Sequence, residues 1–266
     1  MIVIENKQLF TQNNFENPLG YKHTAKNYNL FEKQKRIFSQ HGEDGIIEYI
    51  YSVVQPKHKF YVEFGATSGN WIENSRNLRV NHKWSGLLME GDKNLADKSE
   101  GLVKCEMVSS ANIMNLFEKY NVPYDFDFLS IDVDGDDFYI FKSIDTKKYT
   151  PSVIVLEYNP ALPNICPLVI EEGKSAMHET PITKYASGYY GCNIAAWHAL
   201  SIEKEYSIIT TTGVNVILLK NDLLKLFDFT IPDIKDLIYP PYFIAEQNRF
   251  DDMLTLPDSY KWFKYQ

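Results

Sequence analysis

The chain has 266 residues, a formal net charge of −8 at pH 7, 44% hydrophobic residues and 23% charged residues. This composition is typical of a globular protein and excludes long disordered, collagen-like or coiled-coil stretches. The acidic balance disfavours a nucleic-acid partner, because binding to phosphates depends on clustered lysine and arginine.

No apolar stretch approaches the roughly 20 residues that a membrane-spanning helix needs, and the first residues lack the apolar core of a signal peptide. The three cysteines, Cys105, Cys166 and Cys192, are widely spaced and form no CxxC pair. This pattern predicts reduced thiols rather than a disulfide framework or a structural zinc site. The expected location is the cytoplasm.

Strand and helix patterns alternate along the chain. The apolar periodicity and the turn signals predict, in chain order, a helix over 39–54, a strand over 59–63, a helix over 71–80, strands over 85–90 and 103–108, a helix beginning after Ser109 and Ser110, a strand over 126–131, a helix from 137, a strand over 152–156, a helix over 193–203, and strands over 206–210 and 214–219.

This alternation predicts an α/β fold with a doubly wound, mostly parallel, seven-stranded sheet. The short loop around Gly213 predicts a hairpin between the final two strands, so the last strand should be antiparallel. The expected organisation is an amino-terminal arm or lid over 1–36, a core over 37–222 and a carboxy-terminal extension over 223–266 that packs on the core. Within the core, residues 160–192 form a long proline-containing loop, which we expect to contact substrate.

Polar and acidic residues follow nearly every predicted strand, at 63–69, 90–92, 108–110, 132–134 and 157–159. Ligands of open α/β sheets bind at the carboxyl ends of the strands, near the point where the strand order reverses. The sequence therefore predicts a ligand site along this edge of the sheet.

The turn after the first of these strands, Gly-Ala-Thr-Ser-Gly at 65–69, is not the G-x-G-x-x-G of dinucleotide-binding proteins. Glu63 immediately precedes it, and negative charge there disfavours a pyrophosphate and favours a cationic ligand without phosphate. Glu90, at the end of the next strand, is placed to accept hydrogen bonds from ribose hydroxyls. A nucleoside with a positive centre and no phosphate indicates S-adenosylmethionine.

Several segments resemble FkbM-like class I methyltransferases that use S-adenosylmethionine. They are FYVEFGATSG at 60–69, WSGLLMEGD at 84–92, DFLSIDVDGDD at 127–137, VIVLEYNP at 153–160, SQHGED at 39–44 and the terminal helix with its hairpin. The resemblance covers roughly residues 37–222. Glu63 and Thr67 stand where the family more commonly has Asp and Asn.

The resemblance implies a set of contacts with the cosubstrate. Glu63, Gly65, Ala66 and Ser68 surround the methionine part, Glu90 holds the ribose, Ser109 and Ser110 lie beside the adenine, Asp132 faces the amino group, and Gln40 and Asn74 complete the pocket.

Six aspartates fall within positions 125–137. Two unit charges about 6 Å apart repel by roughly 2–3 kcal/mol at an effective dielectric constant of about 20–25, so solvent, protonation or a cation has to relieve the repulsion. Asp132 and Asp134, together with Glu157 and Asn159, offer an all-oxygen site for Mg²⁺ or Ca²⁺. The alternative is a set of solvent-screened aspartates, of which two begin the next helix.

The candidate catalytic residues are Asp134 and His178, the latter as a general base in the long loop. The leading hypothesis is methyl transfer to an oxygen of a small-molecule or sugar acceptor, such as a nucleotide-linked sugar, a capsule polysaccharide precursor or its modifying group, for example a phosphoramidate. One alternative is a metal-dependent nucleotide-sugar glycosyltransferase that uses Asp132-Val-Asp134. Another is a binding module without catalysis. The sequence is compatible with a homodimer.

Overall fold

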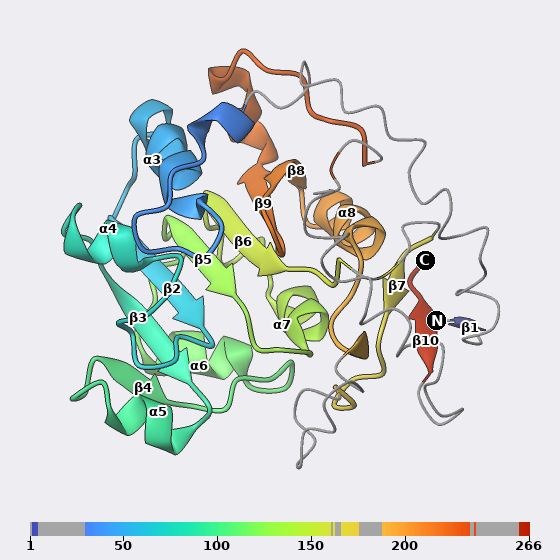
Figure 1. The fold of residues 1–266 in the computed structure, drawn as a ribbon, viewed down its shortest axis with the longest axis horizontal. Helices are drawn as coiled ribbons and strands as arrows, with labels where there is room; N and C mark the ends of the chain where they lie inside the picture. The colour runs from blue at the N-terminus through green and yellow to red at the C-terminus, as the bar shows by residue number, and fades with distance from the viewer. Residues whose placement is uncertain are drawn as a thin grey trace.

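The structure is a computed structural model that describes residues 2–4, 30–160, 162, 166–175, 188–234, 237 and 261–266. Its main feature is a seven-stranded sheet with the order β4-β3-β2-β5-β6-β9-β8 (Figure 1). The strands are β2 (Phe60–Phe64), β3 (Ser85–Glu90), β4 (Val103–Cys105), β5 (Phe128–Ile131), β6 (Val153–Glu157), β8 (Tyr206–Thr211) and β9 (Asn215–Lys220).

The pairings confirm the predicted fold class. The pairs among β2, β3, β4, β5 and β6 are parallel, whereas β9 pairs antiparallel with both β6 and β8. The last strand is therefore inserted between two strands that run the other way. The strand order reverses beside β2, because β3 and β4 lie on one side of it and β5 and β6 on the other.

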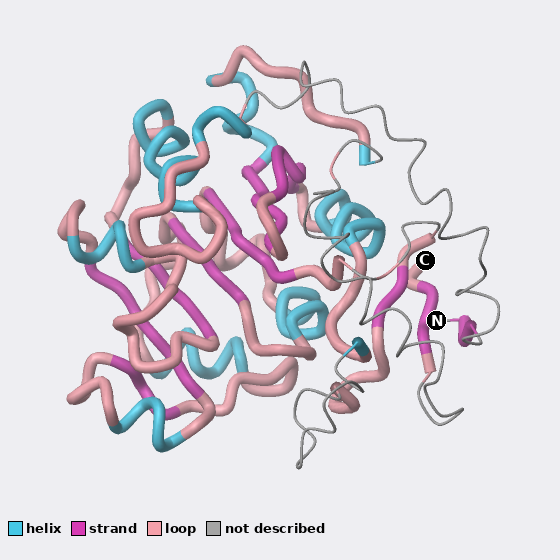
Figure 2. Tube along the Cα trace, in the orientation of Figure 1, coloured by secondary structure: helices cyan, strands magenta, loops and turns pink. Residues whose placement is uncertain are grey.

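Helices cover both faces of this sheet (Figure 2). One layer packs on the face that includes Ile154 and Leu156, and the other on the face that includes Val153 and Val155. Because β6 is covered on both sides, it is a continuous apolar run, as expected for a central parallel strand. The first layer contains α6 (Ile113–Lys119), α7 (Asp137–Ser143) and α8 (Ile194–Glu203), and the second contains α3 (Glu43–Val53), α4 (Arg76–Val80) and α5 (Lys93–Asp97).

Several predicted elements are shorter in the structure, and one helix was missed. The helix expected over 71–80 begins only at Arg76, since hydrogen bonds to Glu63 and Glu73 hold residues 71–75 in a loop. The strand expected over 103–108 ends at Cys105. Helix α5 was missed because it has only five residues; Asp92 caps it by accepting from the amide of Asn94 at 2.7 Å.

A second, three-stranded sheet was not predicted at all. It joins β1 (Ile2–Ile4), β10 (Trp262–Lys264) and β7 (Leu168–Val169) in the order β1-β10-β7, with antiparallel pairs. Figure 1 shows both chain termini at this sheet, beside the large one. Parts of the expected arm, loop and extension are thus paired with one another. Two short 3₁₀ helices, η2 (Phe31–Lys33) and η5 (Asn221–Leu226), complete the described elements.

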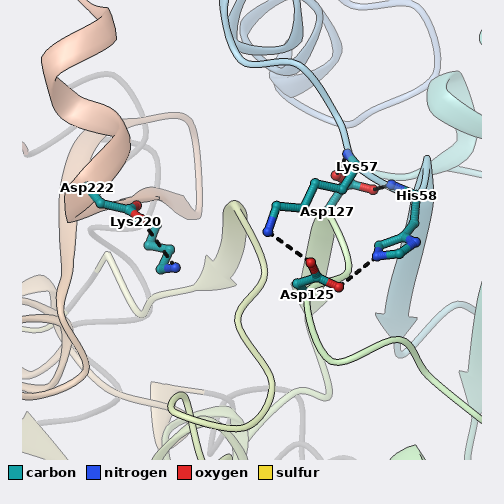
Figure 3. A network of polar contacts seen from close by, with 6 residues as sticks. All are labelled: Lys57, His58, Asp125, Asp127, Lys220 and Asp222. Atoms are coloured by element: carbon teal, nitrogen blue, oxygen red, sulfur yellow. Dashed lines mark hydrogen bonds and ion pairs between the residues drawn. The ribbon is translucent and has the colours of Figure 1, made fainter.

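The opposite, amino-terminal ends of β2 and β5 are joined by polar contacts (Figure 3). The carboxylate of Asp127 accepts from the amides of Lys57, His58 and Phe60 at 2.6, 2.9 and 3.1 Å. Asp125 accepts from the Lys57 ammonium at 2.8 Å and the His58 ring at 2.6 Å, and these contacts lower the pKa of Asp125 to about 2. The six clustered aspartates are therefore two separate groups, with β5 between them.

In the part of the chain that the structure describes, no helix combines the length and the apolar character needed to cross a bilayer.

Candidate functional site

A cavity of about 940 Å³ lies along the carboxyl ends of the strands. Its size is within the range of ordinary small-molecule sites. Residues that follow β2, β3, β4, β5 and β6 contribute to its wall, as do residues at the start of β9. The predicted position of the site, at the edge where the strand order reverses, matches the position of this cavity.

Most of the predicted site residues line this cavity. They are Gln40, Glu63, Gly65, Asn74, Glu90, Ser109, Asp132, Asp134 and Glu157.

Four predicted residues do not line it. Ala66 is fully buried and its amide donates to the carbonyl of Met89. Ser68 is half-buried in the turn, and the Ser110 hydroxyl donates to Glu172. The side-chain nitrogen Nδ2 of Asn159 donates to the carbonyls of Gly188 and Tyr190 at 2.8 and 3.1 Å, so this side chain holds the segment at 188–190. His178 is outside the described residues.

The turn after β2 is fixed by a close approach of two backbone segments. Gly65 has φ +69°, and a Cβ added there would lie 1.6 Å from the carbonyl oxygen of Asp132. Only glycine fits this contact. The turn and the loop after β5 are therefore packed backbone against backbone, which places Asp132 beside the turn.

Carboxylates occupy the backbone amides that a phosphate would need. Glu63 accepts from the amides of Asn74 and Ser75 at 2.8 and 3.0 Å, and also from the Ser75 hydroxyl, at the start of α4. Glu90 accepts from the amide of Thr67 at 3.0 Å, and Glu73 from the amide of Trp71 at 2.8 Å. Phosphate sites use free amides at such turns. Here the amide of Thr67 in the turn, and those of Trp71, Asn74 and Ser75 after it, already donate to carboxylates, which disfavours a pyrophosphate.

Glu63 is only 3% exposed. Its burial raises the pKa to about 7, although the hydrogen bonds from Ser75 and Asn74 favour the ionised form. Glu63 therefore acts in the structure mainly by joining β2 to the start of α4, with part of its side chain at the cavity wall.

The loop after β5 and the end of β6 bring three carboxylates together. Ligand oxygens of Asp132, Asp134 and Glu157 lie within 4.8 Å of one another. Burial, followed by the charges of Asp137 and Asp134, raises the pKa of Asp132 well above its ordinary value. Asp137 is held apart from this group by the amides of Val133 and Gly135, at 2.8 and 2.9 Å, and its burial raises its pKa to about 6.

The segment before α3 is anchored by two buried acids. Asp44 accepts from the amides of Ile37, Phe38 and Ser39 at 2.9, 2.6 and 2.7 Å. Glu43 accepts from the amide of His41 at 2.9 Å and from the side-chain amide of Asn215 at 2.9 Å. These bonds tie the segment to the β8–β9 hairpin and bring Gln40 to the cavity.

The cavity is strongly acidic. Among the described residues that line it there is no lysine, arginine or histidine, whereas nine are acidic: Glu63, Glu73, Glu90, Asp92, Glu106, Asp132, Asp134, Asp136 and Glu157. Such a wall repels anions and favours a ligand with positive charge.

Sequence reasoning missed several wall residues, notably Thr67, Trp71, Met107 and Asn215. Trp71 lies two residues after Gly69, the last residue of the glycine turn. This position was the signal in the sequence that could have placed Trp71 at the cavity. Asn215 is the register partner of Glu157 in the β6–β9 pair, which no local sequence pattern indicates.

No family model matches the sequence, and no curated protein matches it. The solved structures that are similar to this chain include three methyltransferases. DszA carbon methyltransferase has 9% identity and a TM-score of 0.38, and the match covers 66% of this chain and 51% of that one, so this chain spans about half of its length. An S-adenosylmethionine-dependent methyltransferase from Clostridium acetobutylicum ATCC 824 has 11% identity and a TM-score of 0.39, with coverages of 72% and 94%. The plantazolicin methyltransferase BpumL, in complex with S-adenosylhomocysteine, has 11% identity and a TM-score of 0.39, with coverages of 84% and 82%. These likenesses are too distant to carry an argument about activity.

Proposed function

We propose that this chain is a methyltransferase that uses S-adenosylmethionine and transfers the methyl group to an oxygen of a small-molecule or sugar acceptor. The observation that carries the proposal is the acidic cavity at the reversal of strand order. The amide of Thr67 in the turn, and the amides of Trp71 and Asn74 after it, already donate to Glu90, Glu73 and Glu63. A sulfonium nucleoside has the positive charge that such a wall favours and lacks the phosphates that it repels. The FkbM-like resemblance supports the same assignment.

In this proposal Glu90 accepts from the ribose, and the wall around Ser109 receives the adenine. Glu63, Gly65 and Asn74 shape the pocket for the methionine part, and Asp132 faces its ammonium group. The bond from sulfur to the methyl carbon breaks as the bond from the acceptor oxygen to that carbon forms, and the thioether product leaves uncharged. The protein's main contribution is alignment of the two reactants in one line.

The acceptor oxygen has to lose its proton during the transfer. Asp134 lines the cavity and is, among the described residues, our candidate for accepting this proton. His178, which lies outside the described residues, is the second candidate base. A base at this position matters because an alkoxide attacks the methyl carbon far more readily than an alcohol does.

The oxygens of Asp132, Asp134 and Glu157 fit a hard divalent cation such as Mg²⁺ or Ca²⁺, which carboxylate oxygens bind. When bound, such an ion lowers the pKa of a coordinated hydroxyl. It would also offset the acidic wall for an acceptor that carries phosphate, such as a nucleotide-linked sugar, a capsule precursor or a phosphoramidate. Titration of MgCl₂ or CaCl₂ into the protein, compared with the Asp134→Ala variant, tests this part: a rise in the unfolding temperature should occur only in the unmodified chain.

Isothermal titration calorimetry with S-adenosylmethionine, UDP with Mn²⁺, and NAD tests the whole proposal. Binding of S-adenosylmethionine alone is the expected result. Binding of UDP only in the presence of Mn²⁺ would instead support the glycosyltransferase alternative, which the three clustered carboxylates favour. Binding of none of them would support a module without catalysis.

A further inference from the structure

The two most exposed large apolar side chains among the described residues both lie on the cavity wall. Trp71 is 66% exposed and Met107 is 70% exposed. Large exposed apolar groups at the wall of a cavity mark a surface that a ligand covers. Of the two, only Trp71 has an aromatic face.

The backbone of Trp71 is fixed although its indole is exposed. Its amide donates to both carboxylate oxygens of Glu73, at 3.0 and 2.8 Å, and its carbonyl accepts from the Arg76 guanidinium at 2.7 Å. Glu73 is itself only 5% exposed and also accepts from the Thr67 hydroxyl at 2.9 Å. The indole therefore projects from an ordered anchor, as is typical of a pre-organised contact residue.

The loop that carries Trp71 lies between two parts of the cavity wall, the part at the end of β3 and the part after β5. This loop follows β2, and β2 lies between β3, which ends at Glu90, and β5, which leads to Asp132. Under the proposed function, Glu90 belongs to the nucleoside side and Asp134 with Glu157 to the acceptor side. The loop that carries Trp71 is thus at the junction where the sulfur and its methyl group are held.

We propose that the indole of Trp71 packs on the sulfonium of bound S-adenosylmethionine and selects this charged cosubstrate over its neutral product. The inference rests on the proposed function. The face of an indole attracts a cation within about 6 Å, and the attraction is stronger where water is excluded. The thioether of S-adenosylhomocysteine has no such charge, so this attraction ends when the methyl group leaves, which favours product release.

The test is calorimetric affinity for S-adenosylmethionine and S-adenosylhomocysteine in the unmodified chain, Trp71→Phe, Trp71→Leu and Met107→Leu. Trp71→Leu keeps apolar bulk and removes the aromatic face, so it should weaken S-adenosylmethionine by roughly 3- to 30-fold and leave S-adenosylhomocysteine within about twofold. Trp71→Phe should retain most of the preference. Met107→Leu, the matched control on the same wall, should leave the ratio of the two affinities unchanged.

Equal weakening of both ligands by Trp71→Leu would overturn the inference, since it would mean that the indole is only an apolar cover. Unchanged affinities would overturn it as well. In both cases the unmodified chain still binds S-adenosylmethionine, so the proposed function stands. If the unmodified chain binds neither ligand, the proposed function fails and this inference fails with it. Because Trp71 is exposed, the unfolding temperatures of its variants should match that of the unmodified chain, which excludes misfolding as the cause.

Discussion

A Cβ at position 65 would lie 1.6 Å from the carbonyl oxygen of Asp132, so the turn after β2 and the loop after β5 can meet only because residue 65 is glycine. This contact holds together two segments of the cavity wall that are far apart in the sequence. Two consequences follow, one for stability and one for ligand binding.

Gly65→Ala should destabilise the fold by about 3 kcal/mol or more and abolish binding of S-adenosylmethionine, because the added methyl group forces the backbone segments apart. Gly101→Ala is the matched control. Gly101 also has a positive φ, +91°, but an added Cβ there meets nothing within 4 Å, so only the conformational cost of about 1–2 kcal/mol applies. Urea unfolding of both variants measures the difference, and equal losses would contradict the proposed clash.

Glu63 makes the stability of the fold depend on pH. Its pKa rises from 4.5 to about 7 on folding, so the folded state holds a proton that the unfolded state releases. The resulting contribution is fully present below about pH 4.5 and is lost as the pH rises through 7, by about 3 kcal/mol at most. Glu63→Gln should flatten this decline of the unfolding free energy.

The comparison for Glu63 is Glu100→Gln, which changes an exposed carboxylate on the surface. Chemical unfolding at intervals between pH 4.5 and pH 8 gives both profiles. A Glu63→Gln profile parallel to that of the unmodified chain would assign the pH dependence to other groups, of which Asp137, with a pKa raised to about 6, is the first candidate.

Glu90→Ala should weaken S-adenosylmethionine by tenfold or more. The substitution removes the proposed ribose contact and also the acceptor for the amides of Thr67 and Asp92, at 3.0 and 2.8 Å. Loss of a hydrogen bond to a charged group costs about 1.5–3 kcal/mol, which corresponds to this change in affinity. Asp97→Ala, in nearby α5, is the control, since Asp97 forms an exposed ion pair with Lys93. An unchanged affinity in Glu90→Ala would remove Glu90 from the site.

Asp127 and Asp125 are two residues apart and should differ widely in their contribution to stability (Figure 3). Asp127 is 1% exposed and accepts three backbone amides, so Asp127→Asn should cost about 2–4 kcal/mol, because an amide offers fewer acceptors to the same donors. Asp125 pairs with Lys57 and His58 at the surface, and Asp125→Asn should cost less than about 1 kcal/mol. Unfolding free energies in guanidinium chloride decide between these values, and equal costs would refute the difference.

The sequence by itself determined the main sheet of this protein. Period-2 and continuous apolar runs such as Val153–Leu156, broken by glycine and acidic residues, are local signals, and they placed the seven strands, their order of appearance and the final hairpin. The acidic residues at the strand ends were equally visible, because parallel strands bring their carboxyl ends to one edge whatever the details of packing.

Only the tertiary structure decided how those residues are used. Glu63 bonds to the start of α4, Asn159 holds a loop, and Asp127 anchors the far end of β5. In the sequence, Glu63 and Asn159 are candidate ligand-binding residues, and Asp127 belongs to the aspartate cluster over 125–137. The small sheet of β1, β7 and β10 was hidden for a related reason: its strands have only two or three residues and pair across nearly the whole chain. Contacts of that kind depend on which distant segments meet, and local patterns of hydrophobicity and charge contain no information about that.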